Sequence, residues 1–96
     1  MAGSTNNALR RIGLSESDIK VYYALLKLGK ATVTELAEES GVHRTNVYSI
    51  LDKLIEMGLA SYFSEDNRYK YKATDPENLL NYLKENEEEI KKLLPN

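Results

Sequence analysis

The sequence predicts a mainly α-helical fold with one small β-hairpin, and three observations lead to this prediction. Apolar residues recur at three- and four-residue intervals through most of the 96-residue chain, as one buried face of each helix requires. Glycines and capping residues separate these periodic stretches. Between residues 59 and 73 the spacing becomes alternation around the three-residue turn EDN, which is typical of an antiparallel hairpin. A chain of this length has room for one core, so we expect a single domain over residues 1–96.

The N-terminal part of the chain predicts two helices. Residues 1–7 are small and polar, so we expect them to be disordered, and a short helix follows over Ala8–Ile12. The second helix begins after Ser15, an N-cap with Asp18 in the capping-box position. Its apolar stripe ends at Gly29, a typical C-terminal stop.

A two-turn helix and a longer helix come next, joined by a tight glycine turn. Thr34 is the expected N-cap of the short helix, Gly41 ends it, and the long helix covers residues 43–57. Two helices joined in this way form a helix-turn-helix, and the hairpin over residues 59–73 is then a wing. The predicted architecture is therefore a winged helix-turn-helix.

A final helix is expected over residues 76–94, with Asp75 as its N-cap. Its apolar residues follow a four-three spacing with one polar position, as in a coiled-coil seam. The pattern predicts a C-terminal dimerisation helix with a seam formed by Leu79, Leu83, Asn86, Ile90 and Leu93. Packing of this helix on its own domain is the alternative, because Leu80 and Tyr82 broaden the stripe.

Composition limits the possible functions. The net charge is −2, and the acidic excess lies in residues 75–96, while residues 1–74 carry a net charge of +1. Any binding to nucleic acid must therefore depend on a local basic patch. The chain has no cysteine, one histidine and no glycine-rich phosphate loop, so we expect no enzyme activity, cofactor or metal site. No apolar run approaches the roughly 18 residues of a membrane span, and we expect a cytoplasmic protein.

The start of the long helix carries cations where the helix dipole disfavours them. A DNA phosphate at this end would reverse that penalty, because helix N-termini bind anions. Arginine, asparagine, threonine and serine can also bind base edges in the major groove. The candidate DNA-binding residues of this helix are His43, Arg44, Thr45, Asn46, Tyr48, Ser49 and Lys53. An ordinary solvated helix face is the alternative interpretation.

The second strand of the hairpin, RYKYKA, separates two kinds of side chain. Alternation places Arg68, Lys70 and Lys72 on one face and Tyr69 and Tyr71 on the other. We expect the cations to contact DNA phosphates and the tyrosines to pack in the core. Alternatively, the cations protect an edge strand from aggregation.

The chain resembles the TrmB family of transcriptional regulators, in particular their N-terminal DNA-binding domain, over residues 9–75. The resemblance is carried by Gly13-Leu14-Ser15, Val21-Tyr22, Ala24-Leu25-Leu26, Thr34-Glu35-Leu36-Ala37, Gly41-Val42, Arg44, Val47-Tyr48, Leu51, Leu54 and Gly58-Leu59. It implies sequence-specific binding of double-stranded DNA as a dimer. Members of the family commonly have a C-terminal effector domain that senses sugars, and no small-molecule effector site is evident in these 96 residues.

Together these features predict a sequence-specific, double-stranded DNA-binding transcriptional regulator that acts as a homodimer. Residues 43–57 would enter the major groove, and residues 59–73 would contact the phosphate backbone. This function requires Arg44 and the Arg68–Lys72 strand to share one exposed surface. The alternatives are a non-specific architectural DNA-binding protein and a winged-helix module for protein–protein interaction.

Overall fold

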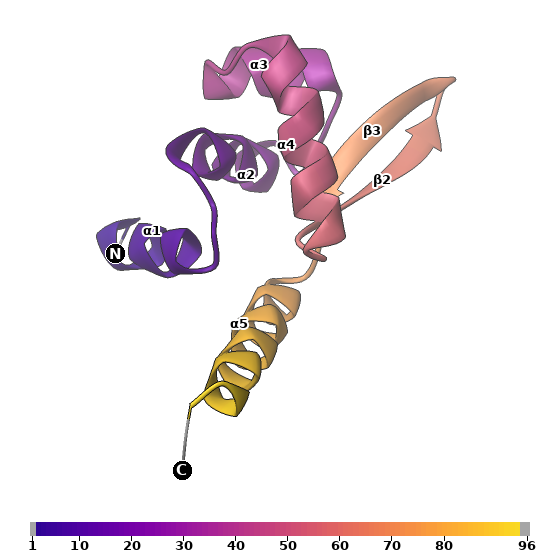
Figure 1. The fold of residues 1–96 in the computed structure, drawn as a ribbon. Coiled ribbons are helices and arrows are strands. Elements are labelled where there is room, and N and C mark those ends of the chain that lie inside the picture. Colours follow the sequence, from indigo (N-terminus) through magenta and orange to yellow (C-terminus); the bar gives the residue numbers. More distant parts are fainter. Residues whose placement is uncertain (1, 95–96) are drawn as a thin grey trace.

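The computed structural model describes residues 2–94, which form five helices and a small sheet whose hairpin projects to one side (Figure 1). The element bounds are α1 (Ala2–Arg11), α2 (Glu16–Leu28), β1 (Lys30–Ala31), α3 (Val33–Ser40), α4 (Arg44–Glu56), β2 (Ala60–Glu65), β3 (Arg68–Ala73) and α5 (Pro76–Lys92). The helix-turn-helix is α3 and α4, and the wing is the hairpin β2–β3. The predicted fold class, mainly helical with a winged helix-turn-helix, is confirmed.

The core forms where α2, α3 and α4 meet. Its members are almost completely buried and come from the predicted apolar stripes, as Leu25, Leu36 and Leu51 illustrate. Gly41 ends α3 in the left-handed conformation at φ +73°, which glycine adopts without steric cost. The turn that follows directs α4 across α2 and α3.

Helix α1 is longer than the sequence suggested. It begins at Ala2, so the expectation of disorder is wrong for residues 2–7, while Met1 lies outside the described residues. Two contacts fix the helix to α2: Leu9 is fully buried, and the Tyr23 hydroxyl donates a hydrogen bond of 2.7 Å to Asn6 Oδ1. Composition alone could not reveal a tertiary contact of this kind.

Helix α3 begins two residues earlier than predicted. Its N-cap is Thr32 and not Thr34, because Thr32 forms a capping box with Glu35. The Thr32 hydroxyl accepts a hydrogen bond from the Glu35 N–H at 3.2 Å, and Glu35 Oε1 accepts one from the Thr32 N–H at 2.9 Å. The Thr-x-x-Glu spacing was available in the sequence as the signal.

The sheet has the strand order β1-β3-β2, and both pairings are antiparallel. The wing turn consists of two residues, Asp66 and Asn67, with φ values of 54° and 61°. A turn with two positive φ angles matches the twist of a hairpin, and aspartate and asparagine tolerate this conformation. The predicted three-residue turn is therefore one residue too long, because Glu65 belongs to β2 and lies opposite Arg68.

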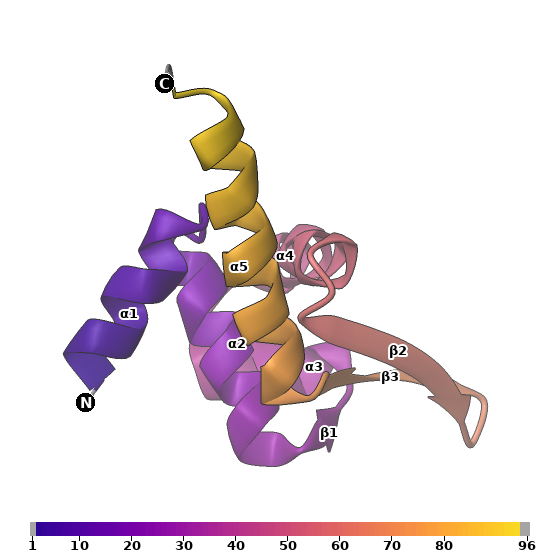
Figure 2. The same cartoon turned by 90° about the horizontal axis from the view of Figure 1, so that it is seen from below.

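Helix α5 extends away from the helix-turn-helix at the end opposite the wing tip (Figures 1 and 2). Tyr82 and Leu83 pack against the core, whereas Ile90 and Leu93 are exposed. The side chain of Leu79 lies outside the described residues. In the part of the chain that is described, no helix has the length and apolar character needed to cross a membrane.

Candidate nucleic-acid interface

Helix α4 separates a buried face from an exposed one, as the apolar spacing predicted. Val47, Ile50 and Leu54 face the core. The exposed residues include every predicted reading residue of its N-terminal half: Arg44, Thr45, Asn46, Tyr48 and Ser49. The hairpin returns alongside α4, so the N-terminus of α4 and the wing lie at the same end of the molecule (Figure 1).

The first turn of α4 is capped by a side chain of the protein itself. His43 is the N-cap residue, and its Nδ1 accepts a hydrogen bond from the Thr45 N–H at 3.3 Å. This position gives His43 a capping role next to the predicted reading residues. The Arg44 guanidinium lies 6.0 Å from the centre of the Tyr48 ring and donates a hydrogen bond of 3.4 Å to its hydroxyl. Contact with the ring holds Arg44 along the exposed face of the helix.

A polar hollow of about 1080 Å³ lies between the start of α3, the start of α4 and the wing. Arg44 and Arg68 both line it, so the cations at the start of α4 and at the wing tip share one surface, as the predicted function requires. Glu35 and Glu38 line the α3 wall of the same hollow. Hydrogen bonds from Thr32 hold the pKa of Glu35 below its ordinary value, and the nearby charges of Lys70 and Arg68 lower this pKa further.

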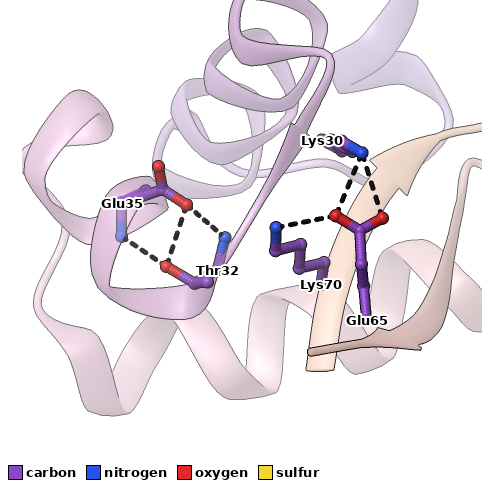
Figure 3. A network of polar contacts seen from close by, with 5 residues as sticks. All are labelled: Lys30, Thr32, Glu35, Glu65 and Lys70. Atoms are coloured by element: carbon purple, nitrogen blue, oxygen red, sulfur yellow. Dashed lines mark hydrogen bonds and ion pairs between the residues drawn. The ribbon is translucent and has the colours of Figure 1, made fainter. Parts of the chain in front are cut away.

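The wing separates cations from tyrosines as predicted, but two of its three cations contact other side chains. Lys70 binds Glu65 Oε1 at 3.0 Å, and Glu65 also accepts hydrogen bonds of 3.0 and 3.1 Å from Lys30 (Figure 3). These hydrogen bonds lower the pKa of Glu65. Lys72 Nζ lies 5.7 Å from the centre of the Phe63 ring. The lysine charges on this face of the wing are therefore partly balanced within the protein.

The structure does not bring Lys53 to the candidate interface. Its Nζ lies 2.7 Å from Asp18 Oδ2 and 2.8 Å from the carbonyl oxygen of Gly13. Nine positions separate Lys53 from Arg44, which is two and a half helical turns, so the two cations project from opposite sides of α4. Lys53 instead connects α4 to the start of α2, so it lies away from the other candidate DNA-binding residues of the helix.

Asp18 is the buried partner in this contact, with 5% of its surface exposed. Burial opposes its ionisation, but hydrogen bonds from Lys53 and from the Ser15 N–H outweigh this effect, and the pKa of Asp18 is lowered. The carboxylate thus completes the predicted capping box of α2 and also fixes the C-terminal half of α4.

The wing tyrosines only partly follow the prediction of core packing. Tyr71 is half-buried against the core, but Tyr69 is 66% exposed, so the prediction is wrong for Tyr69. Tyr62, which the sequence analysis did not select, is directly opposite Tyr71 and is 58% exposed. The hairpin extends past the helices, so the alternation continues beyond the part of the sheet that the core covers (Figure 2).

The family model described as "Sugar-specific transcriptional regulator TrmB" matches residues 9–77. The chain belongs to the TrmB family. A Pyrococcus furiosus protein, "HTH-type sugar sensing transcriptional regulator TrmBL1", is 31% identical over 77 residues, which cover 80% of this chain and 22% of that protein. An uncharacterized protein of Methanocaldococcus jannaschii is 39% identical over 62 residues, which cover 62% of this chain and 52% of that protein. The chain thus spans about a fifth and about half of the lengths of these relatives.

Solved structures show the same fold. The ST1889 protein of Sulfolobus tokodaii superposes with a TM-score of 0.78 at 24% identity, covering 93% of each chain. TrmBL2, described as an archaeal chromatin protein, gives a TM-score of 0.79 at 24% identity over 96% of this chain and 36% of that one. The family is described as one of transcriptional regulators.

Proposed function

We propose that this TrmB-family winged helix binds a specific sequence of double-stranded DNA as a homodimer and thereby regulates transcription. The observation that carries the proposal is the exposed N-terminal half of α4, with Arg44 lining the same hollow as Arg68 of the wing. In helix-turn-helix proteins the second helix lies in the major groove, so this part of α4 would face the base edges. As a regulator of transcription, the protein would act beside the genome in the cytoplasm.

Sequence would be read by side chains in the first two turns of α4. Arg44 can bind the O6 and N7 atoms of guanine, and Asn46 can bind the N6 and N7 atoms of adenine. Thr45 and Ser49 can reach base edges or phosphates. Tyr48 would contribute by orienting Arg44, to which it is hydrogen-bonded at 3.4 Å.

Phosphate contacts would come from fewer cations than the sequence suggested. Arg68 is exposed, whereas Lys70 is bound by Glu65 and Lys53 by Asp18, and Lys72 lies over the Phe63 ring. Two neutralised phosphates per subunit, at Arg44 and Arg68, give a slope of roughly −4 for log K against log salt in the dimer.

Dimerisation through α5 is part of the proposal. Ile90 and Leu93 are exposed near the end of this helix, in positions that a second copy could cover. Leu83 instead packs on its own domain, so the C-terminal turns of α5 carry most of the available apolar surface. A dimer of this kind would place two copies of α4 in major grooves about 34 Å apart.

A salt-dependent gel shift with DNA upstream of the protein's own gene, compared with a random duplex of equal length, tests the proposal. Preferential binding of the upstream DNA with a steep salt slope supports it. Equal affinity for both duplexes favours an architectural role, which we retain because TrmBL2 is described as a chromatin protein. A salt slope near zero would favour the protein-interaction alternative.

A further inference from the structure

The two faces of the wing differ in chemistry. One face carries the cross-strand pairs Tyr62–Tyr71 and Ser64–Tyr69, so all its side chains beyond the core have a hydroxyl group. We call these four residues the tyrosine face. Its rings contact one another, with centres 5.7 Å apart for Tyr62 and Tyr69 and 6.3 Å apart for Tyr62 and Tyr71. These contacts organise the tyrosine face, but its outer two rings remain more than half exposed.

The tyrosine face is continuous with the exposed surface of α4. Tyr69 and Tyr71 line the same hollow as Tyr48 and Arg44, and Arg68 and Lys70 of the opposite face also reach it. Burial raises the pKa of Tyr71, and the neighbouring Tyr48 and Asp52 of α4 raise it further.

The lysines on the opposite face of the wing already contact other side chains of the protein. Lys30 and Lys70 share the Glu65 carboxylate, and Lys72 lies over the Phe63 ring (Figure 3 shows the Glu65 contacts). Contact with a phosphate would compete with these interactions. Contact at the tyrosine face would cover aromatic surface that only solvent now covers.

We infer that the wing binds the sugar–phosphate backbone of duplex DNA through its tyrosine face and Arg68 at its tip, and not through Lys70 and Lys72. This inference rests on the proposed function, because it assigns the wing's part in the same complex. Tyrosine rings can pack against deoxyribose, and their hydroxyl groups can donate hydrogen bonds to phosphate oxygens. Arg44 of α4 and Arg68, which lies at the wing tip on the opposite face, both line the hollow and supply positive charge. Hydroxyl-bearing rings beside two arginines suit this backbone better than an apolar protein surface.

The absence of tryptophan from the sequence permits a direct test. Tyr69→Trp places a reporter on the tyrosine face, and Phe63→Trp places a matched aromatic reporter on the opposite face. Acrylamide quenching of each variant is measured with and without a mixed-sequence duplex of about three helical turns, roughly 30 base pairs. We expect the duplex to reduce quenching at least threefold for the Tyr69→Trp variant and to leave the Phe63→Trp variant unchanged.

Three outcomes overturn the inference. Protection of the reporter at position 63 alone, or of neither reporter while the duplex is bound, rejects the assigned face but leaves the proposed function intact. Protection at position 69 that appears without DNA as protein concentration rises indicates self-association and also rejects it. If neither variant nor the unmodified protein binds the duplex at low salt, the proposed function itself fails.

A second measurement uses variants that keep the rings. We expect Tyr62→Phe/Tyr69→Phe to weaken duplex binding about tenfold, because each hydroxyl would lose a hydrogen bond to a charged group. The salt slope should stay constant, because a neutral side chain releases no counterions. Lys72→Gln is the matched control on the opposite face, and a larger loss of affinity there would overturn the inference. Circular dichroism confirms that each variant is folded.

Discussion

The two ends of α4 each carry a cation, and the two cations differ in their surroundings. One is available to bind DNA, and the other stabilises the fold. At the N-terminal end, Arg44 is exposed, and its guanidinium contacts the ring and hydroxyl of Tyr48. At the C-terminal end, Lys53 binds a carboxylate that is almost completely buried. The same helix therefore presents one cation to solvent and uses the other to fix its own position.

The largest expected effect is on DNA recognition at the N-terminal end. Arg44→Ala should weaken binding to the specific duplex about 10- to 100-fold, because a bidentate contact with guanine is lost. Stability should change by less than about 0.5 kcal/mol, because the side chain is exposed. Titrations with specific and random duplexes measure the first effect, and urea unfolding measures the second. Arg44→Lys is the control: it should retain non-specific binding and lose the preference for the specific duplex.

The next effect concerns stability at the C-terminal end. Lys53→Met should destabilise the fold by about 1–2 kcal/mol, because Asp18 loses a charged hydrogen-bond partner. Under conditions where the variant is folded, the salt slope of DNA binding should equal that of the unmodified protein. Urea unfolding and salt titration together check this prediction. A less negative slope with unchanged stability would instead indicate that Lys53 contacts a DNA phosphate.

Acid should remove the same stabilising contact. Because the pKa of Asp18 is lowered in the folded state, its contribution is present above the unfolded value of about 3.9. The contribution is lost as pH falls through the folded pKa, below that value. The difference in unfolding free energy between the unmodified protein and Asp18→Asn should therefore shrink with acidification. Urea unfolding at a series of pH values measures it, and a difference that grows toward low pH would contradict the assignment.

The smallest effect is expected for a lysine that is already bound. Lys70→Ala should change the salt slope of DNA binding by much less than Arg68→Ala, because Glu65 holds Lys70 at 3.0 Å. Each Arg68 removed should make the slope less negative by about one unit. Binding titrations over a range of salt concentrations compare the two variants. Equal changes would show that Glu65 releases Lys70 when DNA binds.

The exposure of the candidate reading residues of α4 could be predicted from the sequence because helical periodicity separates exposed from buried positions. Arg44 to Ser49 needed only that pattern and the helix-turn-helix order. The alternation in the wing also depends only on neighbouring residues, and it correctly placed Lys70 and Tyr71 on opposite faces. How far the core extends under the hairpin depends on elements distant in the sequence. The exposure of Tyr69 was therefore missed.

What the sequence determined by itself was therefore set by contacts between residues a few positions apart: helix faces, the capping box at Ser15 and the two sides of the wing. Only the tertiary structure decided which charges have partners, because the atoms that bind Lys53 and Lys30 belong to residues 35 positions away along the chain. Such pairs depend on the packing of whole elements against one another. A cation's chemistry is fixed by its residue type, but whether it can meet DNA depends on that packing.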